Sequence, residues 1–150
     1  MLVSEIMTRS PRTVTAETTL MEVASIMCLY RIPALPVVDD GKLVGNISEM
    51  DVLKSLFPST EDTMSGGATL ELERMMPNYS ATMGKKVGDM MVKNPVSVTS
   101  EMHVLKAAAT MTSRRFRRIP VTDSDGVLVG VMSLGDVHKA VFQLHMAGKS

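Results

Sequence analysis

The sequence predicts a mixed α/β fold, of the α+β type, in which two β-α-β-β-α motifs pack together as a pseudo-twofold pair. Three observations favour this fold. The 150-residue chain contains an internal repeat, each copy holds an apolar pattern with helical spacing, and each copy then holds two strand-like runs joined by an Asp/Gly turn. Because one such motif would leave a sheet face uncovered, the two copies are expected to cover one another.

The internal repeat is the most specific of these observations. Met7 and Pro11 match Met91 and Pro95 with an offset of 84 residues, and the match continues through both copies. The turn "VVDDGK" of the first copy corresponds to "VTDSDGV" in the second, which is one residue longer. After this turn the offset is 85 residues. A length change confined to a turn is typical of a true duplication, since loops absorb insertions at little cost.

Each copy is expected to begin with a short extended piece after a proline, "SPRTVT" in the first copy and "NPVSVT" in the second. An amphipathic helix follows, because apolar residues recur at positions i, i+3, i+4 and i+7. These residues are Leu20, Val23, Ala24 and Met27 in the first copy, and Val104, Ala107, Ala108 and Met111 in the second. Thr19 and Glu22 form a capping box at the start of the first helix.

The second half of each copy predicts a hairpin and a final helix. "ALPVVDDGKLVGNIS" and "RIPVTDSDGVLVGVMS" each indicate two strands joined by a turn, and a helix then starts near Ser48 or Ser133. The first motif therefore covers residues 1–57 and the second covers residues 85–146. Residues 58–84 connect them.

The connector is expected to contain one short helix, from Ala68 to Met76, which Pro77 ends. Its "MSGGAT" stretch breaks the chain before this helix. The favoured interpretation is a tether whose helix covers the module or a partner protein.

Composition excludes several classes of protein. With 16 basic and 16 acidic residues the chain has no net charge, which argues against wholesale nucleic-acid binding. The single cysteine, Cys28, lies in an apolar helical stretch and is expected to be a buried structural thiol. No stretch approaches the roughly 20 apolar residues of a membrane span, so the protein is expected to be cytoplasmic, without membrane association.

Nothing in the sequence indicates catalysis. His103, His138 and His145 are scattered, and with one cysteine they give no metal-ligand spacing, so no metal is expected. Neither a GxxxxGKS/T phosphate loop nor a GxGxxG dinucleotide motif is present. The protein is therefore expected not to be an enzyme and to need no catalytic cofactor.

Taken in order, the repeated segments resemble the CBS domain family, and two copies in tandem resemble a complete Bateman module. The residues that carry the resemblance are "VSEIMTRSPRTVT" and "VGDMMVKNPVSVT", the two hairpin runs, and the Ser-x-x-Asp ends. The resemblance implies a regulatory sensor that binds AMP, ADP, ATP or S-adenosylmethionine in the cleft between two motifs. It also implies a homodimer and, since no fused effector domain is expected, a possible separate effector protein.

The Ser-x-x-Asp ends have two compatible interpretations. A serine at the start of a helix, followed by an acid three residues later, is a capping arrangement. The resemblance implies that the same aspartates, Asp51 and Asp136, bind a ribose together with Ser48 and Ser133. Gly45 and Gly130 would let a ligand approach the backbone closely.

The resemblance also implies that basic residues just before the strand bind the phosphates of a nucleotide. In the second copy these residues are Arg117 and Arg118, and guanidinium groups suit phosphate because they remain charged and bind it bidentately. The first copy has Pro33 and Ala34 in their place. Its site is therefore expected to hold an uncharged or positively charged adenosyl ligand, or to stay empty.

The surroundings of the adenine ring are expected to come from backbone and small or apolar side chains. The candidates are Thr13, Ile32, Pro33, Ser97 and Phe116. The family often has glycine four residues before the strand proline, where this chain has Ile32 and Phe116. Phe116 is therefore expected to narrow the first-copy site.

Other interpretations of the same residues stay open. The arginines of "SRRFRRIPV" could form a solvated basic turn or a dimer contact. The whole chain could be a ligand-independent protein-interaction module. A nucleic-acid binder that uses "RRFRR" is the weakest alternative, because the total charge is zero.

Overall fold

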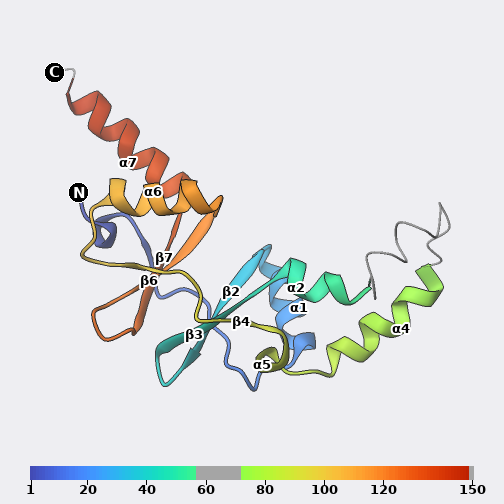
Figure 1. Cartoon of the computed structure of the whole chain (residues 1–150). Coiled ribbons are helices and arrows are strands. Elements are labelled where there is room, and N and C mark those ends of the chain that lie inside the picture. The colour runs from blue at the N-terminus through green and yellow to red at the C-terminus, as the bar shows by residue number, and fades with distance from the viewer. Residues whose placement is uncertain (57–71, 149–150) are drawn as a thin grey trace. The chain divides into compact units, whose positions relative to one another are not determined.

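The computed structural model describes residues 1–56 and 72–148 (Figure 1). Its first-copy elements are the 3₁₀ helix η1 (Val3–Glu5), β1 (Thr8–Arg9), α1 (Leu20–Tyr30), β2 (Ala34–Asp39), β3 (Lys42–Ser48), α2 (Glu49–Leu53) and η2 (Lys54–Leu56). They are followed by α4 (Leu72–Met83), α5 (Val87–Met90), β4 (Val92–Lys93), β5 (Val98–Thr99), α6 (Val104–Arg114), β6 (Arg118–Thr122), β7 (Leu128–Ser133) and α7 (Leu134–Ala147). The predicted mixed α/β class is confirmed.

The chain divides into two compact units that do not follow the two sequence copies. Unit 1 comprises Met1–Arg12, Asp40–Leu43 and Pro95–Ser150, and unit 2 comprises Thr13–Asp39 and Val44–Asn94. The opening residues of each copy are thus part of the unit that holds the rest of the other copy. We call residues 1–12 the first arm and residues 85–94 the second arm.

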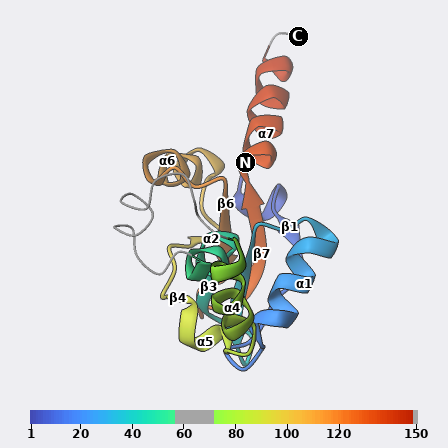
Figure 2. The same cartoon turned by 90° about the vertical axis from the view of Figure 1, so that its right-hand side faces the viewer.

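Unit 1 contains a four-stranded sheet in the order β1-β7-β6-β5. β6 and β7 form the predicted antiparallel hairpin, in which Arg118 lies opposite Ser133. β5 lies parallel to β6 on one side, and β1 of the first arm lies antiparallel to β7 on the other. After the strand ends at Ser133, α7 continues directly from it (Figure 2).

Unit 2 repeats this arrangement with a three-stranded sheet in the order β2-β3-β4. Here β4 of the second arm pairs antiparallel with β3, as β1 does with β7 in unit 1. The extended piece expected in "SPRTVT" forms only one parallel bridge, between Val14 and Val37. It occupies the place that β5 has in the second copy.

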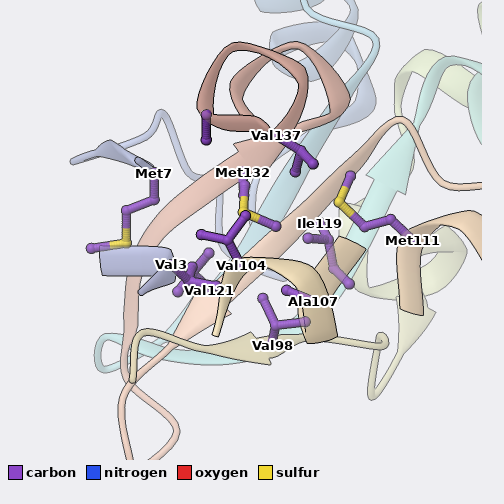
Figure 3. Packing of buried hydrophobic residues seen from close by; sticks show 11 residues of the cluster. Val3, Met7, Val98, Val104, Ala107, Met111, Ile119, Val121, Met132 and Val137 are labelled. Carbon is purple, nitrogen blue, oxygen red and sulfur yellow. The ribbon is translucent and has the colours of Figure 1, made fainter. Parts of the chain in front are cut away.

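Each unit has its own apolar core, and each core contains residues of an arm. In unit 1, Val3 and Met7 of the first arm pack with α6, the sheet and α7 (Figure 3). The buried residues of this core are Val3, Met7, Val98, Val104, Ala107, Met111, Ile119, Val121, Met132, Val137 and Ala140. In unit 2, Val87 of the second arm packs among Val14, Leu20, Val23, Met27, Leu35, Val37, Ile47, Val52 and Met83.

Backbone hydrogen bonds fix both arms in equivalent ways. The amide of Val3 donates to the carbonyl of Met102 (2.9 Å), and the equivalent amide of Val87 donates to the carbonyl of Thr18 (2.8 Å). A further matched pair runs from the helices to the arms. The amide of Val104 donates to Met1 and the amide of Leu20 donates to Lys85, both at 2.9 Å. The two arms are therefore exchanged symmetrically between the copies.

One ion pair adds to the docking of the second arm. The Lys86 Nζ lies 2.6 Å from the Glu17 Oε2. This hydrogen bond, and then the charge of Glu17, raise the pKa of Lys86 above its ordinary value. Because both side chains are exposed, the pair contributes little to stability.

The two glycines singled out in the sequence provide room for the arms, which corrects the expectation that they would give a ligand access. A Cβ atom on Gly130 would lie 2.7 Å from the Met7 Sδ and 2.8 Å from the Thr8 carbonyl oxygen. A Cβ atom on Gly45 would lie 2.6 Å from the Met91 Sδ. The space beside each glycine is thus already filled by the arm of the other copy.

The first amphipathic helix buries the predicted stripe of Leu20, Val23 and Met27. Thr19 caps it, since its hydroxyl accepts from the amide of Glu22 at 3.2 Å. Among the described residues the Glu22 side chain makes no return bond to the Thr19 amide, so only half of the predicted capping box forms. Cys28 is exposed, so its expected burial is wrong. The helix buries one stripe only, and Cys28 follows the stripe residue Met27 by one position, which turns it about 100° away.

The prediction that Pro77 ends the connector helix is also wrong. α4 passes through Pro77 and ends at Met83, while the connector as far as residue 71 lies outside the described residues. A proline inside a helix loses its own amide hydrogen bond, and its ring clashes with the carbonyl four residues earlier, at a cost of about 3 kcal/mol. Met75, Tyr79 and Met83 are four residues apart on one face, and Tyr79 and Met83 pack against the core of unit 2. This burial outweighs the loss.

We predict that Gly130→Ala destabilises the protein by about 2 kcal/mol, because the new methyl group meets a backbone oxygen that cannot move without displacing the arm. Gly45→Ala should cost less, about 1 kcal/mol, because the nearest backbone atom, the Val92 carbonyl oxygen, would lie farther from the new methyl group, at 3.1 Å, and the Met91 side chain can move. Urea unfolding measures both values. Gly135→Ala is the matched control, since its Cβ atom would meet nothing closer than 3.5 Å. Equal stability of the Gly130 and Gly135 variants would contradict the arm contact.

Candidate functional site

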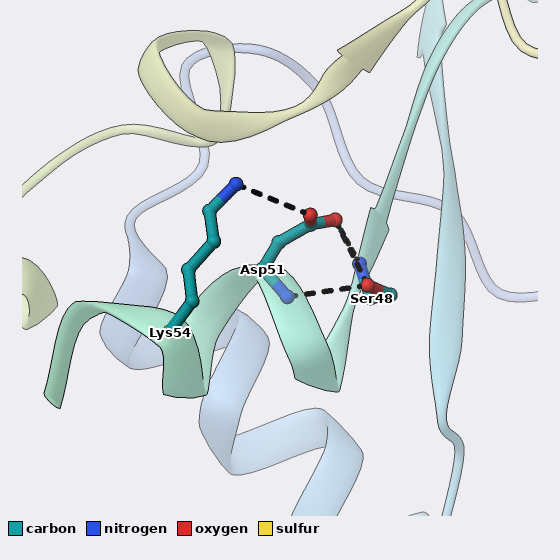
Figure 4. Close-up of polar contacts among 3 residues, drawn as sticks. All are labelled: Ser48, Asp51 and Lys54. Atoms are coloured by element: carbon teal, nitrogen blue, oxygen red, sulfur yellow. Dashed lines mark hydrogen bonds and ion pairs between the residues drawn. The ribbon is translucent and has the colours of Figure 1, made fainter. Parts of the chain in front are cut away.

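The helix start of the first copy is a closed hydrogen-bonded ring (Figure 4). The Oδ2 of Asp51 accepts from the Ser48 amide at 2.8 Å and from the Ser48 hydroxyl at 2.9 Å. The Ser48 Oγ in turn accepts from the Asp51 amide at 3.2 Å. The second carboxylate oxygen, Oδ1, lies 3.7 Å from the Nζ of Lys54. Both oxygens of this nearly buried carboxylate thus face a donor or a cation of the protein.

The helix start of the second copy has the same cap, but fewer polar groups contact its carboxylate. The Oδ2 of Asp136 accepts from the Ser133 amide at 2.9 Å, and the Ser133 Oγ accepts from the Asp136 amide at 3.1 Å. Among the described residues, the Oδ1 of Asp136 has no hydrogen-bond or ion-pair partner, and the Ser133 hydroxyl does not donate to the carboxylate. The partly buried Asp136 therefore retains one acceptor oxygen, and Ser133 retains one donor.

These geometries confirm the capping interpretation in both copies and distinguish the two ends. Lys54 was not singled out in the sequence, although a basic residue three positions after Asp51 is a recognisable helical pair. The second copy has Lys139 in the equivalent place, and no ion pair between it and Asp136 occurs in the described part of the chain. The two sites therefore differ in the conformation of the lysine side chain. The spacing of residues in the sequence, which is the same in both copies, could not predict this difference.

The structure brings the predicted phosphate-binding arginines to the same end of unit 1 as Asp136. The carbonyl of Arg117 accepts from the amide of Leu134, the first residue of α7, at 2.9 Å. Arg118 lies directly opposite Ser133 across the hairpin. Arg117, Arg118, Ser133 and Asp136 thus belong to one edge of the sheet and one helix start, and both arginine side chains are exposed.

Unit 2 has the same backbone arrangement at its helix start, but without the two arginines. The carbonyl of Pro33 accepts from the amide of Glu49, the first residue of α2, at 2.9 Å. Pro33 and Ala34 then lead into β2 as Arg117 and Arg118 lead into β6. The first copy therefore presents a serine and an aspartate at its helix start, but no arginine at these two positions.

The candidate adenine residues are divided between the units. Thr13 and Pro33 are exposed residues of unit 2, and Ser97 is an exposed residue of unit 1 that precedes β5. Ile32 and Phe116 are partly buried and pack against the cores of unit 2 and unit 1 respectively. Their contact with an adenine ring stays a prediction.

The residues directly before Ile32 and Phe116 have an unusual backbone conformation. Arg31 and Arg115 have φ values of 53° and 58°, in the left-handed region, directly after α1 and α6. Ile32 and Phe116 follow them and donate their amides to the carbonyls of Met27 and Met111. An arginine in this conformation had no signal in the sequence, because helix ends of this kind usually carry glycine or asparagine.

Residues 1–56 and 72–148 contain no group of three or more His, Cys, Asp or Glu side chains that could hold a metal ion. Within the same ranges, no helix combines the length and apolar character needed to cross a lipid bilayer.

Comparison with known proteins identifies the repeat. The family model described as CBS domain matches residues 3–58 and 87–143. CBS domain-containing protein CBSX1, chloroplastic, of Arabidopsis thaliana is 33% identical over 97% of this chain and 66% of its own length. Uncharacterized protein MJ1426 of Methanocaldococcus jannaschii is 29% identical, over 94% of this chain and 91% of its own. The chain spans only about half, 51%, of another Arabidopsis relative, CBSX2.

Solved structures extend the similarity to the fold. The crystal structure of CBSX2 in complex with AMP has a TM-score of 0.74 and 30% identity, covering 96% of this chain and 98% of that one. The CBS domain pair of protein MJ0100, in complex with 5′-methylthioadenosine and S-adenosyl-L-methionine, has a TM-score of 0.68 and 25% identity, covering 94% and 99%. Since the family model matches most of the residues in both sequence copies, the chain belongs to the CBS domain family and carries two CBS motifs in tandem.

Proposed function

We propose that this chain is a non-catalytic regulatory module that binds an adenosine-containing ligand at the second-copy helix start. Asp136 and Ser133 would bind the ribose, and Arg117 and Arg118 would bind a phosphate. The observation that carries this proposal is the juxtaposition in unit 1 of a carboxylate with one uncommitted oxygen and two exposed arginines.

The carboxylate of Asp136 suits a ribose. Its cap bond to the Ser133 amide holds it in place, and its remaining oxygen can accept from the two neighbouring hydroxyls of the sugar. The charge makes such hydrogen bonds stronger than neutral ones. Because the side chain is preorganised by the helix start, little conformational entropy would be lost on binding.

The ligand class is supported by relatives in the same family. CBSX2 has been crystallised with AMP, and the MJ0100 pair with 5′-methylthioadenosine and S-adenosyl-L-methionine. All three molecules contain an adenine ring on a ribose, while only AMP carries a phosphate. The arginines of the second copy favour a phosphorylated ligand there. The first copy, with Asp51 engaged by Lys54, would hold an uncharged or positively charged adenosyl ligand or none.

Regulation would follow from different affinities of the ligand for two arrangements of the protein. Thr13, Ile32, Pro33, Ser97 and Phe116 remain the proposed surroundings of adenine, and a separate effector protein remains the proposed recipient of the signal. A cytoplasmic location also stays a prediction from the sequence.

We further propose that the chain forms a homodimer through apolar helix surfaces. The last two turns of α7, which extend beyond α6 in Figures 1 and 2, contain no buried residue. They expose Val141, Phe142, Leu144 and Met146, with Phe142 57% exposed. An isolated helical end of this length is marginal in water, so an apolar partner surface would stabilise it.

We predict that Asp136→Asn weakens AMP binding roughly tenfold or more, the loss expected when a charged acceptor becomes neutral. An asparagine oxygen can still accept from the Ser133 amide, so the cap and the fold should be retained. Isothermal titration calorimetry on ligand-stripped protein measures the affinity. Asp51→Asn is the matched control and should leave the affinity of the second-copy site unchanged.

Equal affinities of the wild type and the Asp136 variant would contradict the ribose assignment. If ligand-stripped wild-type protein binds none of AMP, ATP and S-adenosylmethionine, the proposed sensor is wrong. A partner protein captured regardless of nucleotide would then favour the interaction module.

Arg118→Ala tests the phosphate assignment. We expect it to weaken AMP binding by roughly 10- to 100-fold, the range of one or two charge-assisted hydrogen bonds. Binding of adenosine should be unchanged, because adenosine has no phosphate. Competition against a fluorescent nucleotide measures both ligands. A parallel loss of both affinities would show that Arg118 supports the fold of the site and does not contact phosphate.

Phe142→Ser tests the homodimer. The side chain is exposed, so the fold should persist while the dimer dissociation constant rises at least roughly tenfold, as expected for an aromatic residue central to an interface. Analytical ultracentrifugation measures the association. Val92→Ser, at a residue 53% exposed on β4, is the control. An unchanged dimer in the Phe142 variant, or a monomeric wild type, would rule out this interface.

A further inference from the structure

Two neighbouring helices of unit 2 expose large apolar side chains to solvent. α1 and α2 pack beside each other, and Leu29 of α1 and Met50 of α2 are both 73% exposed. Met21 of α1 and Leu53 of α2 are exposed as well. Met21 and Leu29 lie about two turns apart, on the side of α1 that faces away from its buried stripe. Apolar side chains gathered on adjacent helices are typical of a binding surface.

The second copy shows that the fold does not require these apolar side chains. In the repeat, Leu29 corresponds to Ser113 on α6, and Met50 corresponds to Gly135 on α7. Both Ser113 and Gly135 are exposed, as their counterparts are. The same motif therefore folds with a polar or small residue at each place. The leucine and methionine of the first copy thus need a reason outside the core.

The two helix pairs also differ in charge. The charged residues within α1 and α2 are all acidic, namely Glu22, Glu49 and Asp51. Those within α6 and α7 are Lys106, Arg114 and Lys139, with one acid, Asp136. Both aspartates are engaged in helix caps, so the remaining charge is negative on the first pair and positive on the second. At one pair of matching positions, Glu22 and Lys106, the sign is reversed directly.

We name the two surfaces by these charges. The acidic helix surface consists of the exposed residues Met21, Glu22, Leu29, Glu49, Met50 and Leu53. The basic helix surface consists of the exposed residues Leu105, Lys106, Arg114, Lys139, Val141 and Phe142. Each surface combines apolar side chains with charges of one sign.

The basic helix surface lacks a cover that its counterpart in unit 2 has. Val141 of α7 corresponds to Leu56 of η2 in the repeat. Leu56 is partly buried, and α4 packs against η2. Val141 is exposed instead, and so is its neighbour Phe142. An apolar surface from elsewhere would give α7 the burial that α4 gives to η2.

We propose that the acidic helix surface of one chain binds the basic helix surface of a second copy. The inference rests on the proposed homodimer and specifies which surfaces meet in it. Apolar side chains on both surfaces would be buried, and the charges around them are opposite. If like surfaces met instead, Glu22 and Glu49 of one chain would lie near the same acids of the other. Like charges in an interface weaken association, whereas opposite charges favour it.

Charge reversal tests this pairing on the full chain. Analytical ultracentrifugation at low ionic strength measures the dimer dissociation constant, because salt screens exposed charges. Glu22→Lys and Lys106→Glu should each raise it roughly fivefold, since each turns an attraction into a repulsion. The double variant restores opposite charges and should return to within roughly twofold of the wild type. Each helix should tolerate its change, because the other copy already has that charge at the matching position.

Leu29→Ser tests the apolar part of the acidic helix surface separately. We expect the dissociation constant to rise at least roughly tenfold, as for a large apolar residue within an interface. The melting temperature of the monomer should not change, because Leu29 is exposed and the second copy has serine at this place. Lys93→Glu, at an exposed residue of β4, is the control for the reversed lysine and should leave the dimer unchanged.

The outcomes separate this inference from the proposals on which it rests. A dimer tightened by Glu22→Lys would overturn the inference and show that like surfaces meet. Unchanged dissociation constants in both single reversals, or a double variant as weak as the single ones, would also overturn it while the homodimer stands. A monomeric wild type would overturn both the homodimer and this pairing. AMP titration of the same protein shows separately whether the proposed nucleotide site survives.

Discussion

The structure depends on the contact between each arm and a glycine of the opposite copy. Met7 lies against Gly130 and Met91 lies against Gly45, so closely that a side chain at either glycine would force the neighbouring arm to shift. Because Val3 and Val87 are fully buried in these cores, neither copy of the repeat has a complete interior of its own. The duplication is therefore an obligate one. Two similar halves, each lacking the equivalent piece, complete one another.

This exchange also determines how firmly the candidate site is held. β7 is paired with β6 on one edge and with the first arm on the other, and it ends at Ser133, the residue that caps α7. The hydroxyl and carboxylate at the helix start are thus attached to a strand with both edges satisfied. The proposed ribose-binding role would benefit from such support, because a binding group must be held close to its productive geometry. The same support acts on Ser48 through β3 and the second arm.

Much of the fold followed from patterns within a few residues of one another. Helical spacing predicted α1 and α6, the Asp/Gly turns predicted the hairpins, and Ser-x-x-Asp predicted the caps at Asp51 and Asp136, because each of these signals is local. The exchange of arms could not be predicted, since Val3 and Val87 are equivalent and would satisfy the pattern of either core. The length of α4 also depended on tertiary burial, which outweighs the intrinsic effect of Pro77. At the candidate site, the cap residues were predictable, while the different engagement of the two aspartates was not.

The exposed thiol of Cys28 has a practical consequence. It is the single cysteine of the chain, and it lies on the outward side of α1, away from the residues that form the core of unit 2. A maleimide dye would therefore attach at one defined place without any engineered substitution. Fluorescence from that position offers a spectroscopic view of unit 2, and in an oxidising buffer the same sulfur would cross-link two chains unless a reductant is present.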